Sequence, residues 1–286
     1  MERKSNVATV AAEVEPKRAV LLKEVLSNPI IFDVVKRPVF VDGELVEGKK
    51  AIVRSDTHKV LSIMTDDYVP VSNRQVLEDF ATIAEDAGIK WSLANSYGLR
   101  YGATSIMELR FPNETMKLEK KVVGQEIEMM AYLRNGFDGF NRARLSLGAI
   151  VLVCTNGMTM GRSEFDIGYR HVGQVNKKLV QQFKDFFTQR VAQSRDRLNK
   201  FAQLSFPNRD TVEGMIKASA WIGKTYHDNL LHQWDVAKKP VNAWEVYNTY
   251  TNVITHQVKA NIEGKLALYR KLNEESASWP NSAMAA

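Results

Sequence analysis

The chain has 286 residues, enough to bury one large core or two smaller ones. Hydrophobic residues make up 44% and charged residues 25%, which is typical of a soluble globular protein. No apolar run approaches the roughly 20 residues of a membrane span, residues 1–20 make a poor signal peptide, and a single cysteine excludes an internal disulfide. We therefore expect a protein of the reducing cytoplasm.

The net charge of +6 comes from one segment. Residues 170–200 carry eight bases and two acids, so their excess equals that of the whole chain and the remainder is balanced. A basic segment of this kind permits nucleic-acid binding without requiring it.

The N-terminal half predicts a β-meander interrupted by one helix. β-Branched and apolar runs between turn residues predict strands at 30–41, 51–55, 59–65, 90–102, 104–112 and 126–135. Asp42-Gly43 is typical of a hairpin turn. After the third strand, Ser72 and Gln75 fit a capping box, apolar residues recur at helical spacing, and Gly88 ends the predicted helix.

Helical periodicity returns near residue 174 and continues almost to the end, with breaks at Pro207 and Pro240. Because strands and helices are segregated, the predicted fold class is α+β: an antiparallel β-meander sheet with one packed helix, followed by long C-terminal helices. The predicted organisation is a mobile segment at 1–25, a sheet-rich domain at 26–170, a helical region at 171–278 that packs on the sheet or mediates assembly, and a tail at 279–286.

Residues 142–154 predict a strand that enters from solvent and ends buried. One alternating set is apolar throughout, whereas the other begins with Arg142 and Arg144 and ends at Cys154. The two arginines lie roughly 33–40 Å from the thiol at about 3.3 Å per residue, so they cannot activate it. We therefore interpret Cys154 as a buried packing residue and Asn156-Gly157 as the following turn.

The segment 135–144 just before that strand allows two interpretations. As a nucleic-acid loop, it offers Phe137 and Phe140 for base stacking and Arg142 and Arg144 for phosphates. As a plain hairpin turn, it uses the two phenylalanines to cap the core.

Residues 176–201 predict an amphipathic helix. Its apolar stripe consists of Val180, Phe183, Phe187, Val191, Leu198 and Phe201. Lys177, Lys184 and Arg195 fall on one flank beside that stripe, because steps of 7 and 18 residues return to nearly the same angle. With Lys178, this flank is either a ridge that follows phosphates or an ordinary solvated face.

Other combinations favour no specific reaction. His227 and His232 are five apart without the glutamate of a zinc helix, so we predict no metal site and no cofactor. Glu126 and Glu128 share a strand face near Lys120 and Lys121, which leaves a metal-dependent nuclease as an alternative. The chain has no P-loop, no GxGxxG after a strand, no GxSxG and no CxxC.

Three stretches resemble the phage- and plasmid-borne family called domain of unknown function 932. They are DDYVPVSNRQVLEDF, NGFDGFNRARLSLGAIVLVCTNGM and RHVG, between residues 66 and 173. The matching positions are Tyr68, Asn73, Asn135, Asp138, Gly139, Cys154, Asn156 and His171. Gly136 and Phe137 stand where the family usually has Ser and His, a departure that speaks against an enzyme. The resemblance implies a phage or mobile-element origin.

The leading hypothesis is a non-enzymatic protein that binds, or binds and anneals, single-stranded DNA as a homo-oligomer. In element order the chain is similar to the single-strand annealing proteins of phage recombination. The expected DNA-binding residues are Arg142, Arg144, Lys177, Lys178, Lys184, Arg195, Phe137 and Phe140. The alternatives are a structural or host-interaction (anti-defence) protein and the nuclease.

Overall fold

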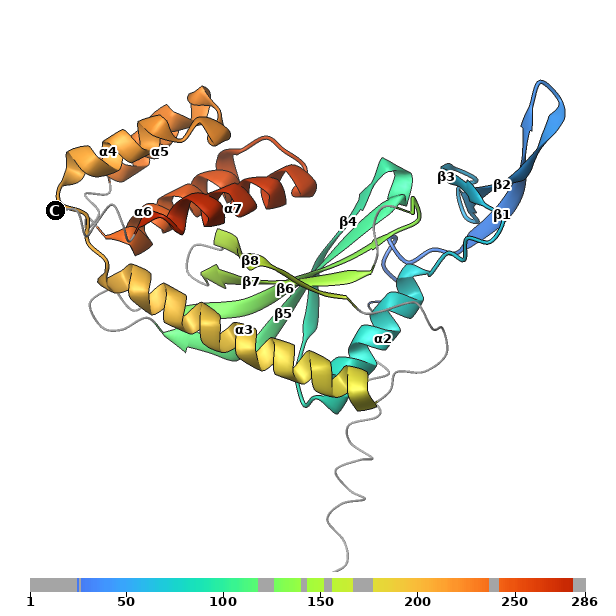
Figure 1. Cartoon of the computed structure of the whole chain (residues 1–286), viewed down its shortest axis with the longest axis horizontal. Helices are drawn as coiled ribbons and strands as arrows, with labels where there is room; N and C mark the ends of the chain where they lie inside the picture. Colours follow the sequence, from blue (N-terminus) through green and yellow to red (C-terminus); the bar gives the residue numbers. More distant parts are fainter. Residues whose placement is uncertain are drawn as a thin grey trace, which may run out of the picture. The chain divides into compact units, whose positions relative to one another are not determined.

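A computed structural model describes residue 25 and residues 27–117, 126–139, 143–151, 156–166, 177–236 and 242–279 (Figure 1). In chain order the elements are β1 (Val34–Val41), β2 (Glu44–Arg54), β3 (Val60–Thr65), α2 (Asn73–Asp86), β4 (Ser92–Leu99), the turn η1 (Arg100–Gly102), β5 (Thr104–Lys117), β6 (Glu126–Gly136), β7 (Arg144–Val151), β8 (Asn156–Asp166), α3 (Lys177–Gln203), α4 (Arg209–Ala218), η2 (Ala220–Ile222), α5 (Lys224–Val236), α6 (Ala243–Asn252), the π-helical turn η3 (Val253–Gln257) and α7 (Ile262–Ser276).

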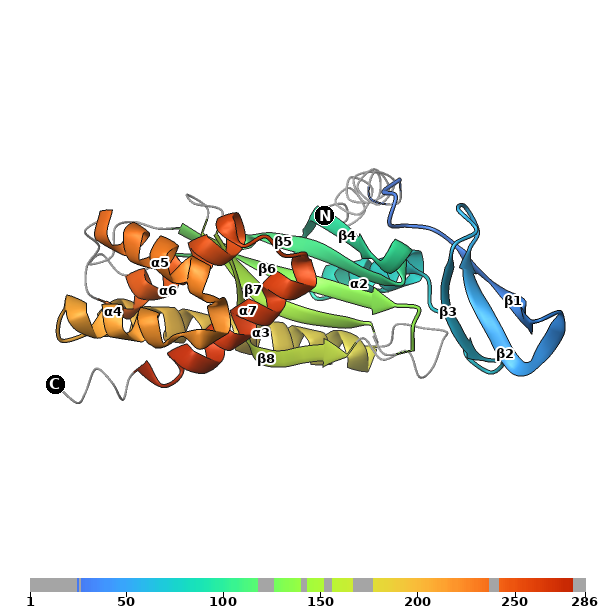
Figure 2. The same cartoon turned by 90° about the horizontal axis from the view of Figure 1, so that it is seen from above.

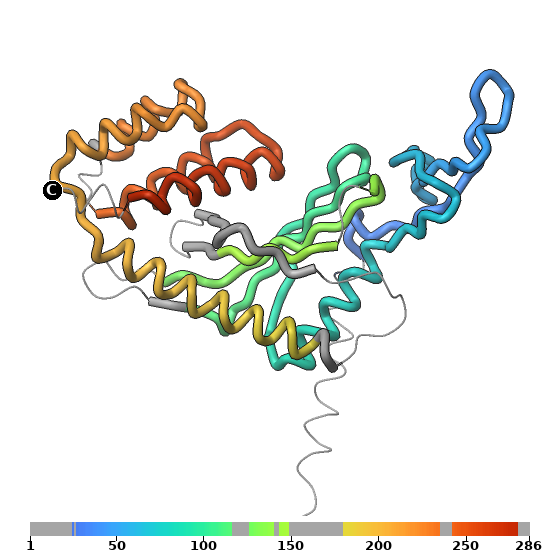
Figure 3. The backbone as a smooth tube through the Cα atoms, in the orientation of Figure 1, coloured from blue at the N-terminus to red at the C-terminus, as the bar shows by residue number. Residues whose placement is uncertain are grey.

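These elements confirm the predicted α+β class: the strands, interrupted by α2, come before the helices α3 to α7 (Figure 3). The chain forms two compact units that alternate along the sequence. The first comprises Met1–Leu109, Leu133–Arg144 and Asp166–Val180, and the second comprises Arg110–Tyr132, Leu145–Phe165 and Gln181–Ala286. The predicted boundary at residue 171 lies outside the described residues, and the predicted domain organisation stays a prediction.

The first sheet is three-stranded and antiparallel, in the order β1-β2-β3. Its hairpin turn lies at Asp42-Gly43 as predicted, with φ values of 52° and 87°. Positive φ at both central residues matches the right-handed twist of the two strands. This turn pairs Val41 with Glu44, so β2 begins seven residues before its predicted start at residue 51.

Helix α2 begins and ends where its local signals predict. The Ser72 hydroxyl accepts a hydrogen bond from the Gln75 backbone N–H, and Gly88 has a φ of 76° just after the helix. The buried side includes Val76 and Phe80, and the Phe80 ring meets Trp91 edge to face.

The second sheet has five strands in the order β4-β5-β6-β7-β8, a meander in which sequence neighbours pair (Figure 2). Asn156 and Gly157 belong to β8, so the predicted turn at these residues is wrong. The stretch MTMGRSEFD that follows lacks clear apolar alternation, and pairing with β7 keeps it extended. Cys154 lies outside the described residues.

Helix α3 packs its apolar stripe onto this sheet. Phe187 meets Phe111 of β5 edge to face at a centroid distance of 4.8 Å. The side chains of Phe183, Phe187, Leu198 and Phe201 are at most 5% exposed, as the helical spacing predicts.

The C-terminal helices surround an aromatic core. Trp279 packs against Phe201, Phe206, Tyr247 and Tyr250. Trp244, Tyr247 and Tyr250 are buried in this core. Among the described helices, none is long and apolar enough to cross a membrane.

Candidate nucleic-acid interface

The β4–β5 connection in the first unit has a strained backbone. Arg100, Tyr101 and Gly102 have successive φ values of 50°, 61° and 100°. This left-handed conformation costs a non-glycine residue about 1–2 kcal/mol, and such strain tends to collect at functional sites. At Gly102 a Cβ atom would lie only 2.7 Å from the Phe32 ring, so the loop depends on glycine there.

Hydrogen bonds from distant segments hold this loop. Arg54 Nη1 donates to the Tyr101 carbonyl at 3.0 Å, and the Phe137 N–H donates to the Ala103 carbonyl at 2.8 Å. Arg100 Nη2 donates to Thr104 Oγ1 at 2.6 Å and to Asp138 Oδ2 at 2.9 Å. The strained conformation is therefore imposed by tertiary contacts.

The loop presents an aromatic ring beside positive charge. Tyr101 is 70% exposed, and Lys59 Nζ lies 5.5 Å from its ring centroid. Arg100, whose side chain is 60% exposed, is the preceding residue. An exposed ring with cations nearby is an arrangement that can stack a base and contact its phosphates.

Arg54 has a different role from its basic neighbours. Its guanidinium lies 3.7 Å over the Phe32 ring and forms two hydrogen bonds with the Asp56 carboxylate, at 2.9 and 2.7 Å. This bonding lowers the pKa of Asp56 to about 2. Arg54 therefore braces the loop, whereas Lys59 and Arg100 reach solvent.

A buried amide network lies under the loop. Asn73 Nδ2 donates to the Ile30 carbonyl and to Ser105 Oγ, both at 2.7 Å. Asn135 Nδ2 donates to the Val71 carbonyl and to Asn73 Oδ1, both at 2.9 Å. Ser105 adjoins Thr104, and Asn135 lies three residues before Asp138, so the network joins the segments that hold Arg100.

Tyr68 and Gly139 complete this region. The Tyr68 hydroxyl donates to the Gly136 carbonyl at 3.5 Å. Burial raises the pKa of Tyr68, and the negative charge of Asp138 raises it further. Gly139 has a φ of 73°, and a Cβ there would lie 2.4 Å from Met64 Cε, so no larger residue fits without displacing Met64.

A family model described as domain of unknown function (DUF932) matches residues 60–278, more than half of the chain. The chain belongs to the DUF932 family. The match extends past residue 173 into the C-terminal helices, which the sequence resemblance left uncovered. No curated protein and no solved structure matches the chain.

Five of the eight positions that carried the DUF932 resemblance come together in the first unit. Asp138 accepts a hydrogen bond from Arg100 of the loop. Asn73 and Asn135 belong to the amide network that includes Ser105, and Tyr68 and Gly139 contact Gly136 and Met64 in the same unit. Of the others, Asn156 begins β8, whereas Cys154 and His171 lie outside the described residues. The matching positions thus include one direct partner of the exposed loop, Asp138.

The residues expected to bind DNA have different environments. Phe137 is fully buried against Phe32, at a centroid distance of 5.6 Å, so it cannot stack on a base; its alternative interpretation as a core residue is confirmed. Arg144 begins β7 and is exposed. Phe140 and Arg142 lie outside the described residues.

Of the four basic residues expected to bind DNA on α3, two have described side chains. Lys184 and Arg195 are both exposed and, eleven residues apart, are separated by about 16 Å along the axis. Neither forms an ion pair or hydrogen bond within the described part of the chain. Lys177 and Lys178 lie in the first turn of α3, but their side chains are outside the described set.

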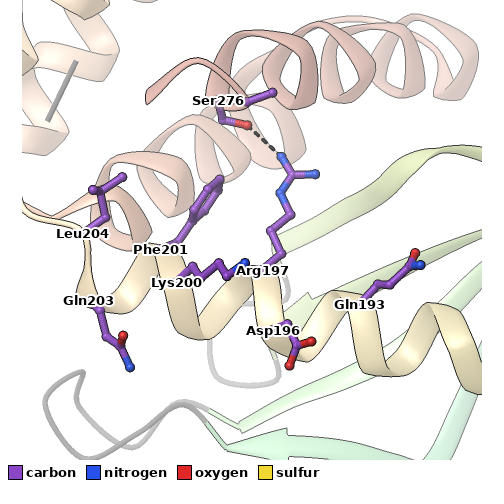
Figure 4. Close-up of a pocket in the computed structure, with 9 residues that line it drawn as sticks. Gln193, Asp196, Arg197, Lys200, Phe201, Gln203, Leu204 and Ser276 are labelled. Carbon is purple, nitrogen blue, oxygen red and sulfur yellow. Dashed lines mark hydrogen bonds between the residues drawn. The ribbon is translucent and has the colours of Figure 1, made fainter. Parts of the chain in front are cut away.

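The other flank of α3 borders a cleft of about 730 Å³ against the end of α7 (Figure 4). Arg197 Nη2 donates to Ser276 Oγ at 2.8 Å and reaches the Asn273 carbonyl at 3.5 Å. Its guanidinium also lies 5.1 Å from the Phe201 ring centroid. Arg197 therefore caps the C-terminal end of α7, where a cation complements the helix dipole.

One carboxylate and one histidine considered for catalysis have structural partners. Glu128 Oε1 lies 3.8 Å from Arg110 Nη1. His227 Nε2 is 2.9 Å from the Ser219 carbonyl. Within the described residues, no group of three or more His, Cys, Asp or Glu side chains is arranged to hold a metal ion.

Proposed function

We propose that this DUF932 protein binds single-stranded DNA, with Tyr101 stacking on a base and Lys59 and Arg100 contacting phosphates. The observation that carries the proposal is the 70% exposure of Tyr101 on a loop that tertiary hydrogen bonds hold in a strained conformation. Base–aromatic stacking tolerates any sequence, because every base has a π face.

A second contact zone lies on the basic flank of α3. Lys184 and Arg195 supply two exposed cations that have no partner among the described residues, and Lys177 and Lys178 extend the same helix toward its start. Arg142, Arg144 and Phe140 are the remaining members of the expected set. Phe137 is not retained, because it is buried.

The proposed setting is DNA recombination or replication of a phage or mobile element in the cytoplasm of a bacterial host, with the protein annealing strands as a homo-oligomer. It needs no cofactor. Positive charge around an aromatic platform supports strand binding, and the concentration of excess charge in residues 170–200 supports a backbone-following helix.

The test is fluorescence anisotropy of a labelled oligothymidylate at about 50 and 200 mM salt, where phosphate contacts differ strongly in strength. We expect Tyr101→Ala to weaken binding by about 1–3 kcal/mol, as for loss of one stacked base, and Tyr101→Trp to retain it. The control is Val69→Ala, because Val69 is 66% exposed but offers no ring. Equal affinity of wild type and Tyr101→Ala would remove Tyr101 from the interface.

The same samples separate the alternatives. Absence of strand binding at low salt would contradict the proposal and favour a structural or host-interaction protein. Cleavage of the oligonucleotide that requires Mg²⁺ and disappears in Glu128→Gln would favour the nuclease.

A further inference from the structure

The β1–β3 sheet concentrates exposed apolar side chains. Eight large hydrophobic residues are exposed in the described parts of the chain, and six lie on this sheet: Val35, Phe40, Val41, Leu45, Val60 and Ile63. A cluster of this kind on a small sheet is typical of a contact surface and not of isolated surface residues.

The outer half of the β1–β2 hairpin has no neighbouring strand. β3 pairs with β2 only between Lys49 and Val53, so the residues from Val39 to Gly48 form a two-stranded ribbon (Figure 1). At its end Phe40 pairs with Leu45, and these side chains are 59% and 52% exposed. A two-stranded ribbon is marginally stable alone in water, so a surface that covers it would stabilise it.

One face of the sheet is covered and the other is open. Ile52 is fully buried in a cluster with Phe32 and Phe137. On the opposite face, the register places Val35 beside Val53 and Val53 beside Val60, and places Arg37 and Ile63 on either side of Ala51. Residues directly opposite each other share a face, so this face exposes Val35, Val60 and Ile63 around Ala51 and Val53, which are each 8% exposed, with Arg37 at its border.

The hairpin also separates its charges. The tip carries only acids, Asp42, Glu44 and Glu47, whereas Arg37 and Lys49 lie toward the base. These five residues form no ion pair within the described structure. Lys36 and Lys50 at the base differ, because both contact Asp66. The hairpin thus has an unpaired negative end and an unpaired positive end.

From this arrangement we infer that the hairpin binds a second copy of the chain, antiparallel and about a twofold axis. In such a contact the acidic tip of one hairpin meets Arg37 and Lys49 of the other, and Phe40 and Leu45 cover the partner's aliphatic face. A twofold interface requires that each patch meet its complement on the same surface, and the hairpin carries both. An unrelated acidic partner would match the basic end but would leave the acidic tip unmatched.

This inference deepens the homo-oligomer part of the proposed function by naming its surface. It is tested without DNA, so its failure and the failure of strand binding are distinguishable. The experiment is sedimentation velocity of the full chain over a range of concentrations. We expect a concentration-dependent dimer for the wild-type protein.

Charge reversal tests the pairing directly. Two double variants each give the two ends of the hairpin the same sign of charge: Arg37→Glu with Lys49→Glu, and Glu44→Lys with Glu47→Lys. Each double variant is expected to weaken the dimer by at least about tenfold. The quadruple variant reverses both ends and is expected to restore the dimer. An equimolar mixture of the two double variants is expected to form a heterodimer.

The control is Asp86→Lys with Lys90→Glu, which changes the same kinds of charge at exposed positions at the end of α2 and just after it, away from the hairpin. Circular dichroism verifies that each variant is folded. A wild-type protein that stays monomeric at every concentration overturns the inference. So does a dimer that persists unchanged in both double variants, because its interface would then lie elsewhere.

Discussion

Each of the two units contains a buried polar network, and the two networks have different structural roles. In the first unit, Asn73, Asn135 and Ser105 link uncharged groups beneath the exposed Arg100–Gly102 loop. In the second, Ser219 contacts Glu275 and Tyr250, each at 2.7 Å, and Trp221 stacks on Tyr250. The first network joins the segments that carry the bonding partners of the strained loop, whereas the second joins the ends of helices. Similar buried chemistry therefore supports a surface in one unit and a core in the other.

The largest expected effect is that of Asn73→Ala. The substitution removes two donated hydrogen bonds and the acceptor for Asn135, and leaves buried partners unsatisfied. We expect a loss of about 3 kcal/mol in the free energy of unfolding, measured in urea. Because the network adjoins the residues that hold Arg100, strand affinity of the folded fraction should fall as well.

The matched control for that substitution is Asn95→Ala. Asn95 is exposed and donates to Glu108 at 3.2 Å, so we expect a loss below about 1 kcal/mol. Equal losses in the two variants would show that the buried network adds nothing beyond an ordinary surface amide.

Glu275→Ala tests the other side of the comparison. Its carboxylate accepts from the Ser219 hydroxyl and from the Trp221 indole N–H. We expect a loss of about 2 kcal/mol of unfolding free energy without a change in the strand affinity of the folded protein. A large fall in affinity at unchanged foldedness would contradict the distinction between the two networks.

Local signals explain which elements the sequence predicts correctly. The Asp42-Gly43 turn, the Ser72 cap and Gly88 act over a few residues, so the first hairpin and α2 follow from them. β8 has no comparable signal, because MTMGRSEFD lacks alternation and is extended through pairing with β7. The turn expected at Asn156-Gly157 was wrong for the same reason: sheet pairing overrides a local preference.

The candidate site depends even more on distant contacts. Tyr101 stands between Arg100 and Gly102 in a segment that predicts a plain strand. Its exposed, left-handed conformation requires Arg54, 47 residues away, and the Phe137 N–H beyond β6. The sequence signal that was available is the family motif at Asn135, Asp138 and Gly139. This motif includes Asp138, a partner of the loop, but none of the loop residues themselves.

Tyr247 makes the core of the second unit sensitive to high pH. Burial raises the pKa of Tyr247 to about 12, from an ordinary value of 10.0. The folded state therefore holds this proton more tightly, and the associated stability is complete below pH 10 and lost as pH rises toward 12. The expected loss between pH 9 and pH 11 is about 1.4 kcal/mol.

The comparison of wild type with Tyr247→Phe in urea at both pH values isolates this group. The variant loses the hydrogen bond from the Tyr247 hydroxyl to Asn273 Oδ1 at 2.8 Å, so it should be less stable at pH 9 by about 1 kcal/mol. Its further loss toward pH 11 should be smaller than that of the wild type. An identical pH dependence in the two proteins would contradict the assignment to Tyr247.

The smallest expected effect lies at the surface of the first unit, where Asp138 and Arg100 form an ion pair at 2.9 Å. Asp138→Asn keeps an acceptor for Arg100 and Thr104 but removes a negative charge beside the proposed phosphate site. Since Arg100 is largely exposed, the unfolding free energy should change by less than about 1 kcal/mol. The affinity for single-stranded DNA should rise two- to threefold, on the order of 0.5 kcal/mol, because Arg100 becomes free to contact phosphate.

Arg100→Gln should instead lower the affinity for DNA and reduce the salt slope by about 1. If the pair served only to hold the loop, both substitutions would weaken binding and the salt slope would stay constant, so the opposite signs of the two effects distinguish a phosphate contact from a structural brace.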